Sequence, residues 1–209
     1  MTTGELPDGR RLRGDATRRK VAREAAMIAT TNGLDSITVG ALAIATGVSK
    51  SGILTVFGNR EAIQLAAVAE ARNIYREEVL SKAYQAAPGA PRLRALMDSW
   101  VGYLHAGVFP GGCFIAATTA EYGRRSGAVA DAVRQLKRDW LTLLETELEA
   151  AGSPHPAADA FTIDALLTAG NTRRELFADD AELERARDLA IRIVEQLAGG
   201  TAPLSSSAR

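Results

Sequence analysis

The chain has 209 residues, of which 46% are hydrophobic, enough to bury a substantial core in one or two domains. Its 25 Lys/Arg balance its 25 Asp/Glu, and Cys113 is the single cysteine, which excludes an intrachain disulfide and favours a reducing compartment. No run of about 18 apolar residues predicts a membrane span, and the polar N-terminus lacks the apolar core of a signal peptide. We therefore expect a cytoplasmic globular protein.

The balanced charge is unevenly distributed along the chain. Residues 1–65 contain nine Lys/Arg and six Asp/Glu, a net charge of +3, so the remainder carries −3. A basic N-terminal part joined to a mildly acidic body is typical of a module that binds a polyanion and is connected to a second domain.

The N-terminal residues 1–15 are polar and contain Gly and Pro, which predicts a flexible basic arm. Its arginines fit two interpretations, a phosphate or minor-groove contact with DNA and a solvated leader without a role. Residues 17–31 follow the helical period in their apolar positions, and Asn32-Gly33 is a typical helix end.

The stretch from Thr38 to Arg60 predicts a helix, a tight turn and a second helix. Thr38, Ser49 and Asn59 each stand at the N-cap of an expected helix, and Gly47 stands at the turn. In the second helix Ile53 and Phe57 share the face that packs on the body. The opposite face is small and polar and carries a cation at the helix start, as in a recognition helix.

The rest of the chain shows only helical patterns, separated by Gly/Pro-rich breaks, with no strand pattern and no internal repeat. We therefore predict an all-α fold. The expected helices cover about 60–83, 92–108, 113–122, 128–151, 157–177 and 180–197.

These motifs resemble the tetracycline-repressor (TetR) family of bacterial transcription regulators. The resemblance is carried by Gly47-Val48-Ser49-Lys50, Phe57 and Arg60-Glu61, and more weakly by Gly111-Gly112-Cys113 and the run Ala181 to Arg187. Leu54 departs from the family pattern, which usually has a tyrosine there, and Leu54 is expected to contact a sugar or a thymine methyl group instead.

The resemblance implies base contacts near Lys50, Ser51, Gly52 and Thr55, and phosphate contacts at helix starts by Thr38 and Arg60. The partner is then a palindromic double-stranded DNA operator. The complete DNA-binding set that we predict is Thr38, Ser49, Lys50, Ser51, Gly52, Leu54, Thr55, Asn59 and Arg60.

The resemblance also implies a homodimer through the last two helices and a small-molecule effector bound among the others. Those two helices carry more apolar residues than they need to pack on each other. Single aromatic residues are at least as often ordinary core. The residues predicted to line the effector pocket are Trp100, Leu104, Phe114, Thr118, Tyr122, Trp140 and Asn171.

Other chemistry has little support in the sequence. Cys113 is either a redox-sensing thiol at a helix start or, more often in such a setting, a small buried group. His105 and His155 have no ligand neighbours at a useful spacing, so we expect no metal site, no cofactor and no catalytic residues. Thr118, Glu121 and Asn171 are polar residues on apolar helices that either orient a ligand, cap or pair between helices, or face water.

The sequence thus predicts a three-helix DNA-binding head at residues 16–62 and a helical ligand-binding and dimerisation domain at 63–198, followed by a disordered tail at 199–209. The expected function is a sequence-specific regulator, a repressor released from its operator by a small molecule. The alternatives are a ligand-independent or redox-responsive DNA-binding regulator and, less favoured, an enzyme on a helical scaffold.

Overall fold

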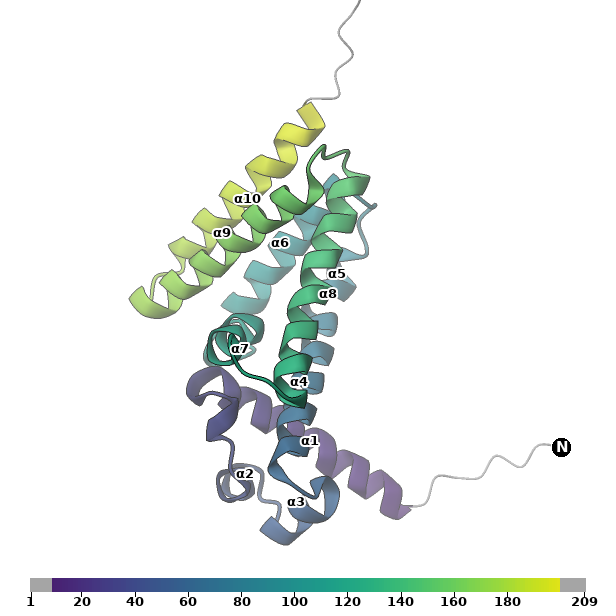
Figure 1. Cartoon of the computed structure of the whole chain (residues 1–209), viewed down its shortest axis with the longest axis vertical. Helices are drawn as coiled ribbons and strands as arrows, with labels where there is room; N and C mark the ends of the chain where they lie inside the picture. The colour runs from purple at the N-terminus through teal and green to yellow at the C-terminus, as the bar shows by residue number, and fades with distance from the viewer. Residues whose placement is uncertain (1–8, 200–209) are drawn as a thin grey trace, which may run out of the picture. The chain divides into compact units, whose positions relative to one another are not determined.

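The computed structural model describes residues 9–199, and within that range the fold is all-α, as predicted (Figure 1). The predicted arm lies partly, and the predicted tail almost wholly, outside the described residues. The helices are α1 (Gly9–Asn32), η1 (a 3-10 turn, Leu34–Ser36), α2 (Val39–Thr46), α3 (Lys50–Phe57), α4 (Arg60–Tyr75), η2 (a π-helical turn, Arg76–Leu80), α5 (Ser81–Ala83), α6 (Ala90–His105), α7 (Phe114–Tyr122), α8 (Ala128–Ala150), α9 (Pro156–Phe177) and α10 (Ala181–Gly199).

The chain forms two compact units, and neither is a continuous segment. Unit 1 comprises the described residues up to Ile74 together with Phe109–Arg134, and unit 2 comprises Tyr75–Val108 together with the described residues from Gln135 onward. Helix α7 and the first turns of α8 therefore belong to the unit that contains the helix-turn-helix, whereas the sequence places that boundary near residue 62.

Unit 1 is built around the apolar face of α1 and the helices that follow it. Val21 and Ala25 on α1 are fully buried, and so are Leu34, Ile37, Leu42, Ile53 and Ile63 from the next four elements. Burying a side chain of Leu or Ile stabilises a fold by about 1.5–3 kcal/mol, so this small cluster is the main stabilising force of the head.

The expected start of the first helix of unit 1 needs correction. Helix α1 begins at Gly9, not Thr17, so residues 9–15 are helical and do not belong to a flexible arm. Helix α2 buries Leu42, whereas Ala41, Ile44 and Ala45 are exposed, Ile44 at 87%. An eight-residue helix can bury only one narrow stripe, and Leu42 together with Thr46, four residues on, makes up that stripe.

Unit 2 contains α6, α9, α10 and the greater part of α8. Helices α9 and α10 lie side by side (Figure 1), and Gly170 on α9 permits this because a Cβ atom there would collide with Ala186 on α10. Glu147 on α8 is almost completely buried, where it accepts hydrogen bonds from the Gly89 amide and from Arg92, both at 2.8 Å. This pairing satisfies a carboxylate that would otherwise be costly to bury.

No single helix within residues 9–199 has the length and apolar character needed to cross a membrane. Helices α2 and α3 pass the same test only as a pair, with a bend of 114° between them. Leu42, Ile53 and Phe57 from this pair are buried in the core of unit 1.

Candidate nucleic-acid interface

The helix-turn-helix is held by local caps at each helix start, as predicted. Thr38 Oγ1 accepts from the Ala41 amide at 3.1 Å, and Ser49 Oγ accepts from the Gly52 amide at 3.1 Å. Gly47, between the two helices, has a φ of 69°, which glycine adopts without steric cost. These bonds satisfy amides that a helix start leaves without partners, so the angle between α2 and α3 is fixed by residues within the motif.

Asn59 likewise caps α4, since its Oδ1 accepts from the Ala62 amide at 2.8 Å. The residue before it, Gly58, ends α3 with a φ of 76°. Helix α3 is therefore bounded at both ends by residues suited to that purpose, and its eight residues form a rigid rod of about two turns.

Helix α3 has one buried and one exposed face. Ile53 is fully buried and Phe57 is 6% exposed. The opposite surface, which we call the α3 outer face, consists of Lys50, Ser51, Leu54 and Thr55, all exposed. Such a face, with a cation in the first turn, can enter a major groove and contact base edges.

The two hydroxyl groups of the α3 outer face are partly engaged within the protein. Thr55 Oγ1 donates to the Ser51 carbonyl at 2.8 Å, and Ser51 Oγ lies 3.2 Å from Ser49 Oγ. Leu54 is 44% exposed. The face therefore offers one cation, apolar surface and hydroxyl oxygens that can still accept hydrogen bonds.

Helix α1 supports the C-terminal end of α3 through Arg18, a contact that the sequence does not predict. Its Nη2 donates to the Val56 carbonyl at 3.2 Å, and its guanidinium lies 4.9 Å from the centre of the Phe57 ring. An arginine that the sequence places on the solvated side of α1 thus helps to anchor α3. Arg18 stands among other basic residues of α1, and nothing in the sequence distinguishes it from them.

The start of η1 is capped by a residue that is distant in sequence. Glu121 on α7 accepts from the Leu34 amide at 2.7 Å and from the Asp35 amide at 3.0 Å. Of the three roles open to Glu121 in the sequence, the structure selects capping between helices. Gly33 makes room for it, because a Cβ atom there would lie 3.0 Å from the Glu121 carboxylate.

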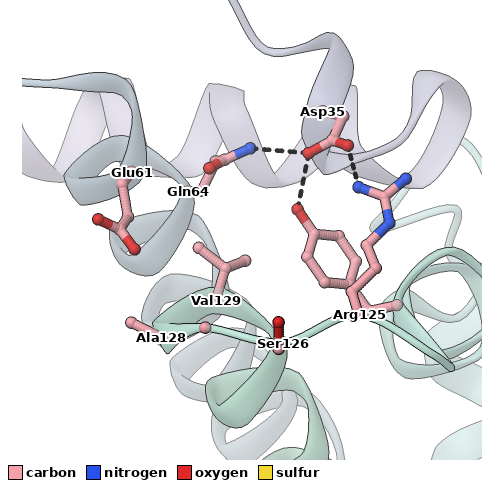
Figure 2. Close-up of a pocket in the computed structure, with 9 residues that line it drawn as sticks. Asp35, Glu61, Gln64, Arg125, Ser126, Ala128 and Val129 are labelled. Carbon is pink, nitrogen blue, oxygen red and sulfur yellow. Dashed lines mark hydrogen bonds and ion pairs between the residues drawn. The ribbon is translucent and has the colours of Figure 1, made fainter.

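Asp35 is the centre of a polar cluster, which we call the Asp35 cluster and define as Asp35, Gln64, Glu121, Tyr122 and Arg125. Figure 2 shows Asp35 with Gln64 and Arg125 beside it. The Asp35 carboxylate accepts from the Tyr122 hydroxyl at 2.8 Å and from Gln64 Nε2 at 3.3 Å, and forms an ion pair with Arg125. Gln64 Nε2 also donates to the Leu34 carbonyl at 2.9 Å. Three elements of unit 1, α4, α7 and the segment after α7, thereby converge on η1.

The electrostatics of the cluster follow from these bonds. Hydrogen bonds from Arg125 and Tyr122 hold the pKa of Asp35 below its ordinary value, because both stabilise the ionised carboxylate. Burial of Tyr122, reinforced by its hydrogen bond to Asp35, raises the pKa of the phenol to about 12. The neighbouring carboxylate raises the pKa of Arg125 as well. At neutral pH the ionised Asp35 carboxylate is therefore paired with the Arg125 cation and with the neutral Tyr122 phenol.

A shallow cavity of about 250 Å³ adjoins the cluster. Its lining includes Glu61 from α4 and Ser126 from the segment before α8 (Figure 2). Tyr122 is the one residue of the predicted effector pocket that lines it.

Arg60 also turns towards this region. Its guanidinium donates to the Asp35 carbonyl oxygen and lies 3.9 Å from the Asp35 carboxylate. Its side chain remains 51% exposed, so a phosphate contact stays a prediction for this residue.

The structure distributes the predicted pocket residues over both units. Phe114, Thr118 and Tyr122 belong to unit 1, and Trp100, Leu104, Trp140 and Asn171 belong to unit 2. All seven are buried. Thr118 donates to the Phe114 carbonyl at 2.8 Å, and Trp140 Nε1 donates to Asp164 at 2.9 Å. These bonds satisfy the polar atoms of two residues whose role in a pocket remains a prediction. Within residues 9–199, no group of three or more His, Cys, Asp or Glu is placed to hold a metal ion.

Comparison with known proteins agrees with this architecture. Residues 89–190 match the family model described as the tetracyclin repressor-like C-terminal domain. No curated protein matches the sequence significantly.

Solved structures share the fold at low sequence identity. A TetR transcriptional regulator from Chloroflexus aurantiacus aligns with a TM-score of 0.80 at 22% identity, covering 88% of this chain and 97% of the other. A TetR-family regulator from Cytophaga hutchinsonii gives 0.78 at 19% identity, covering 92% and 98%. AibR, solved with isovaleryl coenzyme A and operator DNA, gives 0.66 at 18% identity, covering 85% and 97%.

The family model covers α6 to the middle of α10, and the helix-turn-helix motif accounts for the N-terminal part that the model does not include. Residues 89–190 thus match a tetracyclin repressor-like C-terminal domain, and the chain as a whole shares the fold of solved TetR-family transcriptional regulators.

Proposed function

We propose that the protein is a repressor that binds a palindromic operator as a homodimer in the cytoplasm and is released by a small-molecule effector. The observation that carries this proposal is the α3 outer face, an exposed surface with one cation on a helix whose other side is fully buried. A helix held in this way presents its side chains to DNA at a fixed angle, which specific base readout requires.

Surface chemistry on the last two helices supports the dimer. Phe161 and Leu176 are 73% and 72% exposed, and Phe177 is 57% exposed. Large apolar side chains of this kind gather at protein–protein contacts, and arginines such as Arg173 and Arg185 supply a polar rim. A two-fold dimer places two recognition helices about 34–36 Å apart, one turn of DNA, and so fits a palindrome.

Effector control follows from the same arrangement. An effector that binds more tightly to a dimer with a different head spacing shifts the population away from the DNA-bound form. The predicted pocket residues are the apolar and polar groups that would favour one state over the other. AibR offers a precedent, since that protein was solved with both a small acyl-coenzyme A and operator DNA.

The first test is a selection of genomic DNA fragments by the purified protein at defined salt. We expect one short palindromic site. The double variant Lys50→Ala/Thr55→Ala should then lose at least about 100-fold in operator affinity, because it removes the cation and a base-edge contact from the α3 outer face. Lys82→Ala, an exposed helical lysine of unit 2, is the matched control and should bind as wild type does.

Two outcomes would contradict the proposal. Recovery of fragments without a common site, with binding that disappears as salt rises, would show only non-specific attraction to phosphate. Equal operator affinity of the double variant and the Lys82→Ala control would mean that α3 does not read the DNA.

A redox-responsive regulator is the second candidate, and the structure gives it less support. Cys113 directly precedes α7 but is only 7% exposed. Redox-sensing thiols are usually accessible to the oxidant. If mild peroxide releases wild-type protein from the operator and leaves Cys113→Ser bound, this second function replaces the effector-controlled one.

A further inference from the structure

The Asp35 cluster is part of the DNA-binding head, although three of its residues lie more than 80 positions after Asp35 in the chain. Segment Phe109–Arg134 leaves unit 2, enters unit 1 and returns to unit 2 through α8. Within unit 1 this segment has one carboxylate, one phenol and one guanidinium that contact η1. The head of this protein is thus assembled from two separate stretches of sequence.

The part of the head that these residues contact is the element directly before the DNA-binding helices. Residue Ile37 alone separates the end of η1 from Thr38, the N-cap of α2. Ile37 is fully buried and extended, with a φ of −62° and a ψ of 119°. Because Ile37 is buried and is the single residue between η1 and the N-cap of α2, a change in the direction of η1 would change the direction of α2 as well.

The contacts of Glu121 are of the strong kind. A carboxylate that accepts from two successive amides forms two charge-assisted bonds and fixes its partner in both distance and angle. The Asp35–Arg125 pair differs, because its side chains are 46% and 43% exposed and an exposed ion pair contributes little to stability. Its effect is instead to hold the Asp35 side chain where Tyr122 and Gln64 reach it.

A second contact ties the same segment to α1. The Gly111 amide donates to Thr30 Oγ1 at 3.2 Å, and the Gly111 backbone packs directly on the Thr30 carbonyl group. The segment is therefore anchored on both sides of Gly33, at the end of α1 and at the start of η1.

We propose that Glu121, Tyr122 and Arg125 are positioning residues for DNA binding, which set the direction of η1 and thereby the placement of α2 and α3 on the operator. This inference rests on the proposed function of the α3 outer face and extends it to residues of α7 and the segment after it. None of the three needs to touch DNA for its loss to weaken operator binding.

The test compares operator affinity and thermal stability in two matched pairs of full-length variants. Glu121→Gln loses the charge and one acceptor of the double cap, and Glu149→Gln makes the same chemical change at an exposed position of α8. Arg125→Ala loses the ion pair with Asp35, and Arg124→Ala removes the same charge from the adjacent exposed position. Stoichiometric titration gives the active fraction, so that affinity refers to folded protein alone.

We expect Glu121→Gln to weaken operator binding by about tenfold or more and Arg125→Ala by about threefold, while both controls stay within about twofold of wild type. Each variant and its charge-matched control should have the same affinity for non-operator DNA, because phosphate attraction depends on charge more than on helix placement. A merely structural role would lower the melting temperature and the active fraction but leave the affinity of the folded protein unchanged.

Tyr122→Phe and Asp35→Asn keep the test informative if Glu121→Gln does not fold. Tyr122→Phe removes one hydroxyl group and retains the ring, so it should fold and weaken operator binding by about threefold. If Tyr122 acts through Asp35, the double variant Tyr122→Phe/Asp35→Asn should lose no more affinity than Asp35→Asn alone.

The outcomes separate this inference from the proposed function. If wild type selects no specific site, the proposed function is wrong and the positioning role is wrong with it. If wild type selects a site and every folded cluster variant binds that site as tightly as its control, the positioning role alone is overturned.

Discussion

The helices of the helix-turn-helix and the turn that precedes them are capped by different means. Helices α2, α3 and α4 are capped by Thr38, Ser49 and Asn59, each of which bonds to an amide three residues away. The turn η1, which precedes them, has no side-chain cap from its own N-cap residue, Gly33. Its amides are capped by Glu121, 87 and 86 residues further along the chain.

The difference shows which part of the head can be changed independently. Local caps need only neighbouring residues, so the starts of α2 and α3 are defined within the motif itself. The amides at the start of η1 are capped from α7, and the segment Phe109–Arg134 that contains α7 is joined to unit 2 at both ends. Four predictions, in order of decreasing expected effect, test this contrast.

Gly111→Ala should cause the largest loss of stability, about 3 kcal/mol or more, because the new Cβ atom would overlap the backbone carbonyl group of Thr30 and backbone atoms cannot move aside as a side chain can. Gly102→Ala is the control. Its Cβ atom would meet nothing within 4 Å inside helix α6, so we expect a gain of up to about 1 kcal/mol. Denaturant unfolding measures both, and equal stabilities would show that the α1–Gly111 contact does not hold the head.

Ser49→Ala should lower the free energy of unfolding by about 1 kcal/mol, since it removes the local cap of α3. The loss should be confined to the head, so hydrogen exchange should accelerate in α3 and stay unchanged in α9. Ser153→Ala, which removes a hydroxyl in the loop before α9, provides the comparison. Faster exchange in η1 to the same degree as in α3 would show that the two regions are not independent.

The predicted contact between Leu54 and a thymine methyl group can be tested by removing that methyl group from the DNA. Replacing a thymine by uracil at the operator position that Leu54 contacts removes one methyl group, and burial of one such group is worth about 0.8 kcal/mol, roughly a fourfold change in affinity. Scanning each thymine in turn should identify that position with wild-type protein. With Leu54→Ala the same substitution should have no effect. A thymine scan that is identical for both proteins would mean that Leu54 makes no base contact.

Much of the unit-1 geometry could be predicted from the sequence because its signals are short in range. The three caps, the glycine at the turn and the buried positions Ile53 and Phe57 all follow from spacings of three or four residues. The Asp35 cluster could not be predicted, because a lone Asp and a lone Arg 90 positions apart carry no mark of their pairing. The one signal was Glu121, a charged residue on an otherwise apolar helix.

The smallest expected effect is on how the stability of the fold changes at acidic pH. The pKa of Asp35 is lower in the folded protein than in the unfolded chain, where 3.8 is the ordinary value, so its ionised form stabilises the fold. That contribution is complete above about pH 3.8 and is lost as pH falls through the lower folded value. Wild type should therefore melt slightly above Asp35→Asn near neutral pH, and the difference should shrink below pH 3.8.

Melting temperatures recorded across the acid range measure this difference. Asp15→Asn, which removes an exposed carboxylate from α1, accounts for the general effect of lost charge. The side chains of Asp35 and Arg125 are nearly half exposed, so water and salt screen much of the interaction and the difference should be small. A difference between wild type and Asp35→Asn that grows as pH falls would contradict the direction of the pKa shift.

The sequence by itself determined the helical class, the position of the helix-turn-helix and the identity of the side chains exposed on α3. These properties depend on periodicity and on caps within one or two turns, where neighbours in sequence are neighbours in space. Tertiary structure alone decided that α7 belongs with the head and that Glu121 caps η1. Those contacts join residues whose approach depends on how the intervening helices fold back, and no local pattern of residues encodes that path.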